Sequence, residues 1–188
     1  GSSLTAVGTA ALDANTTADS NTAVGHHALS ATTTGNSNVA IGDYAMSAST
    51  TADRNVAVGS NAMASLTASG DTYCTAIGFR AAQNSTSASQ FTALGADTLT
   101  AQTTANYNVA IGYLSGSSLT TGGSNTSVGR ASLAANVTGG NNVVMGYNAY
   151  RLGNDGSNNV AIGNDALEDN TASHNTAVGY FALNQNTT

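Results

Sequence analysis

The chain is 188 residues long and has a mass of 18.5 kDa, enough for one ordinary domain, yet Ala, Thr, Asn, Ser and Gly make up about two-thirds of it. Large apolar side chains are too few for a single compact core, while the absence of Pro and the 7% of charged residues argue against disorder. The net charge of −6 leaves no basic surface for nucleic acid, and no apolar run approaches the roughly 20 residues that span a bilayer.

A repeat runs through the whole chain. An apolar residue followed by Gly recurs eleven times, and all but two of the intervals are 17 residues long. The anchor glycines are Gly8, Gly25, Gly42, Gly59, Gly78, Gly95, Gly112, Gly129, Gly146, Gly163 and Gly179. Self-similarity at a fixed period is the mark of a solenoid, so the sequence predicts about eleven stacked coils.

Each coil begins with a predicted strand of three residues directly before the anchor Gly, such as 39–41 or 160–162. Val or Thr, then Ala, then an aliphatic residue is a β-branched pattern with period two, which places two side chains on one face. We expect this pair of side chains to lie inside the coil. The Ala row between them would let a second chain approach closely, and the Asn before each strand would hydrogen-bond along the stack.

The remainder of each coil is a corner, a second short strand or bend, and a loop. The anchor Gly permits the corner, and the Ala-Leu or Ala-Met pair that follows, as at 28–29, returns a large side chain to the interior. Thr-Thr then recurs in the loop, as at 33–34. Parallel ladders would be about 4.8 Å apart. Because each coil holds only two or three large side chains, we expect several chains side by side, with three as the expected number.

Five strings carry a resemblance to a known family: NTAVGHHAL (21–29), NVAIGDYAM (38–46), NVAVGSNAM (55–63), NVAIGNDAL (159–167) and NTAVGYFAL (175–183). They resemble the head repeat of YadA-like trimeric autotransporter adhesins, and similar strings recur in phage tail fibres. The resemblance implies an all-β, left-handed parallel β-roll (a solenoid) of about eleven 17-residue coils, assembled as a homotrimer. The coil is longer than the family's commonest one, and Ser115-Gly116 replaces Ala-Leu.

The resemblance also implies a non-catalytic structural or adhesive segment of an extracellular fibre, on a cell surface or on a virion, that attaches to a cell-surface glycan or protein. We expect residues 1–2 to be a cloning remnant and residues 3–188 to be a single β-roll domain, a fragment of a longer fibre. A spacer shaft without a ligand is the alternative. A second alternative is an ice-binding solenoid that uses the Thr-Thr ladder, although turn chemistry explains those loop residues better.

Clusters of ionisable residues are candidates for chemistry, but none forms a convincing site. His26 and His27 lie about nine coils from His174, too far to share a metal ion within one chain. The carboxylates occupy different coils or outward corners without a companion nucleophile; they are Asp43, Asp97, Asp165, Glu168 and Asp169. We therefore expect no catalytic, cofactor-binding or metal-binding residues.

An aromatic row remains. Phe79, Tyr113, Tyr147 and Tyr180 each follow an anchor Gly, in alternate coils. Exposed aromatic rows suit carbohydrate stacking and protein interfaces, so these four residues are the candidate ligand contacts. Ring-on-ring packing at a corner is the interpretation that we favour from the sequence.

Overall fold

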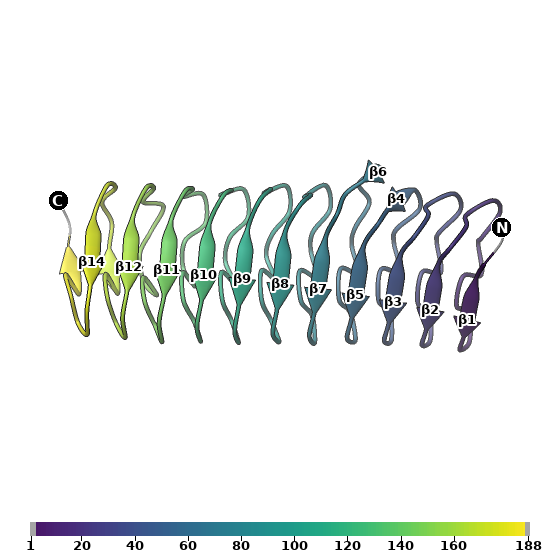
Figure 1. Cartoon of the computed structure of the whole chain (residues 1–188), viewed down its shortest axis with the longest axis horizontal. Coiled ribbons are helices and arrows are strands. Elements are labelled where there is room, and N and C mark those ends of the chain that lie inside the picture. The colour runs from purple at the N-terminus through teal and green to yellow at the C-terminus, as the bar shows by residue number, and fades with distance from the viewer. Residues whose placement is uncertain (1–2, 187–188) are drawn as a thin grey trace.

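The chain forms a rod of stacked coils in the computed structural model, which describes residues 3–186 (Figure 1). The residues expected to be a cloning remnant, 1–2, lie outside the described part. Eleven parallel strands, one from each coil, form a continuous sheet along the rod: β1 (Thr5–Val7), β2 (Thr22–Val24), β3 (Val39–Ile41), β5 (Val56–Val58), β7 (Thr75–Ile77), β8 (Thr92–Leu94), β9 (Val109–Ile111), β10 (Thr126–Val128), β11 (Val143–Met145), β12 (Val160–Ile162) and β14 (Thr176–Val178). The predicted parallel β-solenoid is therefore confirmed. The described residues contain no helix long and apolar enough to cross a membrane.

The register of the sheet pairs equivalent positions of successive coils. Ala40 lies opposite Ala57, and this pairing of equivalents continues along all eleven strands. The register survives the one interval of 19 residues, because the two extra residues lie in the loop and Val56 still pairs with Thr75. That loop adds a small parallel pair, β4 (Ala52–Asp53) with β6 (Gly70–Asp71), at the upper edge in Figure 1. A second such pair is β13 (Asp169–Asn170) with β15 (Gln185–Asn186).

The interior is built from the small row of the strand, which corrects the expectation from the sequence. Ala40 and its equivalents are buried, whereas the flanking residues, such as Val39 and Ile41, face outward and are half-buried or exposed. The Leu or Met after the corner is buried as expected, as Leu29 and Met46 are. The reason is thickness: the large side chain after the corner, joined in some coils by a second one such as Leu66, fills most of the coil. Room is left for a small side chain from the strand, which is Ala except at Ser127 and Val144.

The corner places residues in backbone conformations that L side chains rarely adopt. Every anchor Gly has a positive φ, and for Gly112 this angle is 123°. A Cβ built on Gly112 would lie 2.6 Å from the carbonyl oxygen of Gly129 in the next coil. The inward Leu and Met residues also have a positive φ, 50° for Leu29 and 49° for Met46. The left-handed conformation turns the chain back so that these side chains point inward, at a cost of about 1–2 kcal/mol each.

Buried asparagines bridge successive coils, as the sequence predicts. The side-chain carbonyl of Asn125 accepts a hydrogen bond from the backbone N–H of Asn142, at 2.9 Å. Asn142 in turn accepts from Asn159 N–H and donates its Nδ2 to the carbonyl of Gly156 across the coil, both at 2.9 Å. The ladder is interrupted where Cys74 and Phe91 occupy the Asn position. Burial raises the pKa of the Cys74 thiol to about 11.

Replacing an internal anchor Gly should disrupt stacking beyond the cost of its backbone angle. Gly112→Ala adds a clash with the next coil, whereas Gly179→Ala, with φ of 131° and only one contact at 4.0 Å, meets no stacked carbonyl. We expect Gly112→Ala to lower the free energy of unfolding by about 1–3 kcal/mol more than Gly179→Ala. Urea denaturation followed by circular dichroism measures both. Equal losses would mean that the backbone angle alone accounts for the glycine.

Removing one rung of the Asn ladder should leave a buried backbone N–H without a partner. Asn142→Ala orphans the N–H of Asn159, while the carbonyl of Gly156 keeps the hydrogen bond from Asn136 Nδ2 at 3.2 Å, so we expect a loss of about 1–3 kcal/mol in the free energy of unfolding. Asn84→Ala, at an exposed position, is the control and should change it by less than about 0.5 kcal/mol. The same denaturation assay tests the pair, and a small effect of Asn142→Ala would show that water replaces the amide.

Candidate functional site

The residue after each anchor Gly forms an outward row at the corner of the rod, which we call the corner row. The four aromatic members predicted as ligand contacts, Phe79, Tyr113, Tyr147 and Tyr180, are 47–75% exposed. They do not stack on one another as favoured from the sequence, because every second coil carries another residue type there. Only Tyr180 contacts a ring among the described residues, that of its neighbour Phe181, at 4.5 Å between centroids.

Cations on the surface are matched to acids one coil further along. Three arginines and one histidine have a carboxylate partner exactly one repeat, 17 residues, ahead: His26–Asp43, Arg54–Asp71, Arg80–Asp97 and Arg151–Glu168. Stacking in register places these side chains side by side. Three of the pairs follow directly from the 17-residue period, whereas Arg54–Asp71 crosses the longer coil, where Asp71 is in register with Asp53. All four pairs are exposed or half-buried, so each contributes little to stability.

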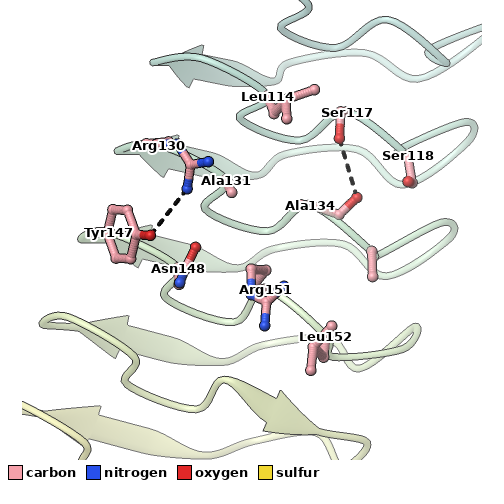
Figure 2. A pocket seen from close by; sticks show the side chains of 11 residues that line it. Leu114, Ser117, Ser118, Arg130, Ala131, Ala134, Tyr147, Asn148, Arg151 and Leu152 are labelled. Atoms are coloured by element: carbon pink, nitrogen blue, oxygen red, sulfur yellow. Dashed lines mark hydrogen bonds between the residues drawn. The ribbon is translucent and has the colours of Figure 1, made fainter.

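Arg130 breaks this rule. Tyr113 and Tyr147 occupy the equivalent positions in the coils before and after it. Its guanidinium lies 5.9 Å from the centroid of the Tyr113 ring and 5.2 Å from that of Tyr147. Its Nη1 donates a hydrogen bond of 3.1 Å to the Tyr147 hydroxyl (Figure 2). No carboxylate of the described residues is within ion-pair distance of it.

A groove of about 580 Å³ lies beside Arg130 and crosses three coils (Figure 2). Apart from Arg130, the middle coil contributes only alanines, and the coil after it contributes larger side chains. The lining residues are Leu114, Ser117, Ser118, Arg130, Ala131, Ala134, Ala135, Tyr147, Asn148, Arg151 and Leu152. Because Ala134 and Ala135 stand where the next coil has Arg151 and Leu152, the surface of the middle coil is hollowed there.

The basic rim of the groove has one compensated and one uncompensated charge. Arg151 donates to Glu168 Oε1 from Nε at 3.1 Å and from Nη2 at 2.7 Å. These bonds, with a further one from Asn184 Nδ2, lower the pKa of Glu168 below its ordinary value. Arg130 keeps its charge facing an aromatic surface, where the ring faces stabilise a cation.

The other ionisable candidates lie apart from the groove. His26 and His27 pack around Tyr44 near one end of the rod, with the His27 and Tyr44 rings stacked at 5.0 Å. His174 lies near the other end, where its Nε2 is 3.4 Å from Asn158 Nδ2. The described residues contain no group of three His, Cys, Asp or Glu placed to hold a metal ion.

The carboxylates considered from the sequence are each engaged locally. Asp43 and Asp97 belong to the ion pairs above, and Asp165 is buried and accepts a hydrogen bond from Asn164 Nδ2. Asp169 is exposed on β13, while Glu168 faces Arg151. None of these arrangements couples a carboxylate to a nucleophile.

Comparison with known proteins finds no relative of this chain. No protein-family model matches the chain, and neither a curated protein nor a solved structure matches it. The function is therefore inferred from the geometry of the rod.

Sequence reasoning found the aromatic row but missed the groove and the singular position of Arg130. The signal was present: comparing each Arg with the residue 17 positions later finds an acid in every case but that of Arg130. The hollow was also encoded, as Ala at 131, 134 and 135 beside Arg151 and Leu152 one period on.

The ion pair on the groove rim should govern the titration of Glu168. A depressed carboxyl pKa contributes stability above the ordinary carboxyl pKa, and this contribution is lost as the pH falls through the folded pKa. Arg151→Gln should therefore raise the pKa of Glu168 towards its ordinary value, as measured by carboxyl ¹³C NMR. Arg80→Gln, which removes a pair elsewhere, should leave it unchanged. An unmoved pKa in the first variant would contradict the role given to Arg151.

Proposed function

We propose that the chain is a non-catalytic segment of an extracellular homotrimeric fibre, a left-handed parallel β-roll that attaches to a cell surface. The observation that carries the proposal is the outward face of the eleven-stranded sheet, which we call the aliphatic face. Its two outward positions per strand are occupied by Val, Ile, Leu, Met or Thr alone. Residues more than a third exposed on this face are Val7, Ile41, Ile77, Leu94, Val109, Val143, Met145, Ile162 and Val178.

We expect the aliphatic face to be buried against another protein surface. An unbroken row of aliphatic side chains along the full sheet indicates an interaction surface, because soluble monomers rarely expose extended apolar patches. Copies of the same chain fit it, because equivalent residues recur at the spacing of the coils and two parallel rods match over their whole length. The number three rests on the resemblance to trimeric adhesin heads, which also supplies the hand of the coil and the location on a cell surface or virion.

Attachment is assigned to the corner row, which lies outside the aliphatic face and remains available in an assembled rod. The exposed rings of Phe79, Tyr113, Tyr147 and Tyr180 supply contact area for a cell-surface glycan or protein. The Thr ladder is less suited to binding, because its hydroxyls are used within the rod: Thr33 Oγ1 donates to the carbonyl of Thr50 at 3.2 Å, and Thr103 donates to that of Thr120 at 3.2 Å.

Self-association should depend on the aliphatic face. Light scattering at micromolar concentration should give three times the 18.5 kDa chain mass. Val109→Lys combined with Val143→Lys should dissociate the assembly, since each buries a charge without a partner. Thr121→Lys, at an exposed loop position, should not. Val109→Thr with Val143→Thr, which uses a residue native to this row, should weaken association while keeping the β-sheet circular dichroism. A stable monomer of the unaltered chain would overturn the proposal.

Assays on the trimer also distinguish attachment from the two alternatives, a spacer shaft and an ice-binding solenoid. Binding to cells or to a glycan array supports the adhesive assignment, and its complete absence would leave a spacer shaft. Thermal hysteresis without cell or glycan binding would favour the ice-binding alternative instead.

A further inference from the structure

We infer that the groove beside Arg130 binds an acidic oligosaccharide, with a sugar carboxylate on the guanidinium and a sugar ring against Tyr147. This inference rests on the proposed attachment function, for which it names the ligand class and the site. It follows from three observations: the uncompensated charge, the aromatic wall formed by Tyr147 and the hollow floor.

The charge identifies the ligand as an anion. In a chain of net charge −6, every other arginine has an acid in the next coil, yet Arg130 has Tyr147 there. A guanidinium carries five N–H donors, and the bond to the Tyr147 hydroxyl uses Nη1. Donors therefore remain for a planar carboxylate, which an arginine binds through two parallel hydrogen bonds.

The position of the guanidinium is defined before a ligand arrives. Tyr113 and Tyr147 lie on its two sides at 5.9 and 5.2 Å, and the Tyr147 hydroxyl accepts its hydrogen bond. These contacts restrict a side chain that would otherwise lose considerable freedom on binding. Arg80 differs, because its Nε donates to Asp97 Oδ1 at 2.7 Å and the bound acid already occupies the fork.

The groove identifies the ligand as a sugar. Its volume of about 580 Å³ is within the usual range for small-molecule sites. Ala134 and Ala135 line it together with Ser118 and Asn148, so the surface offers methyl groups beside polar groups. A sugar has the matching character, with apolar C–H faces for the Tyr147 ring and the floor, and hydroxyls for Ser and Asn. A purely apolar ligand would leave the charge of Arg130 without a counter-ion.

The floor is specific to this part of the rod. The coil of Arg130 has the buried Ala131 and the half-buried Ala134 and Ala135 where the next coil has Asn148, Arg151 and Leu152. The inference therefore places one site per chain at this level of the rod.

Titration calorimetry on the assembled chain tests the inference with matched probes. Trigalacturonate and sialyllactose carry carboxylates, galactotriose and lactose are their neutral counterparts, and lactose 3′-sulfate carries a different anion. We expect the carboxylated sugars to bind at least tenfold more tightly than the neutral and sulfated ones. Failure of both carboxylated sugars to bind at millimolar concentration would overturn the inference, as would equal binding of the neutral or the sulfated sugar.

Matched variants locate the site. Arg130→Gln should weaken binding at least tenfold, whereas Arg80→Gln should leave it within twofold. Ala135→Leu should fill the groove and cause a similar loss without altering a charge, and Ala48→Leu, at the equivalent position of another coil, should not. Equal effects of the two arginine variants, or no effect of Ala135→Leu, would overturn the placement.

Light scattering on the same samples separates this inference from the proposed function. An intact trimer that binds no acidic sugar rejects the groove as the site and leaves the fibre standing. A monomer that binds the carboxylated sugar rejects the fibre and retains the groove. If Arg130→Gln dissociates the trimer, Arg130 serves assembly and the inference is wrong.

Discussion

The close stacking of one glycine corner on the next is the constraint on which the rest of the structure depends. Where the Cβ of Gly78 would lie, the carbonyl oxygen of Gly95 would be only 2.4 Å away, so no side chain fits between successive corners. This approach aligns the coils in register, and register then turns every sequence position into a row along the rod. Strand pairing, the Asn ladder and the surface ion pairs all follow from that alignment.

Because each sequence position forms a row along the rod, the repeat determines the surface chemistry. A residue type repeated at one position becomes a continuous strip, as the outward Val and Ile residues show, while a single departure becomes a local feature. Arg130 is such a departure in charge pairing, and the Ala residues of its coil are one in shape. In a solenoid, departures from the repeat therefore mark candidate functional positions, while positions that keep the repeat maintain the fold.

Much of the fold could be predicted from the sequence because the repeat states it eleven times. The strands, the glycine corner, the inward Leu29 and its equivalents and the Asn bridges follow from local chemistry. Which strand side chains face inward does not follow from local chemistry. Alternation distinguishes two faces of the strand but does not indicate which face is buried. Coil thickness decides that, and it depends on Leu29 and Met46 adopting a positive φ, which their side chains do not suggest. The groove was missed because it requires comparing three adjacent coils rather than one coil with its consensus.

The two extra residues between Gly59 and Gly78 show where this architecture can change. They enlarge the loop around β6 while Val56 and Thr75 remain paired, so the sheet does not register the insertion. The loops also stack, as the bond from Thr33 N–H to the carbonyl of Thr50 shows, but the loop edge accepts extra residues, so a segment inserted there would leave the strand pairing intact. The rod therefore combines a sheet whose register is fixed with a loop edge that accepts additional residues.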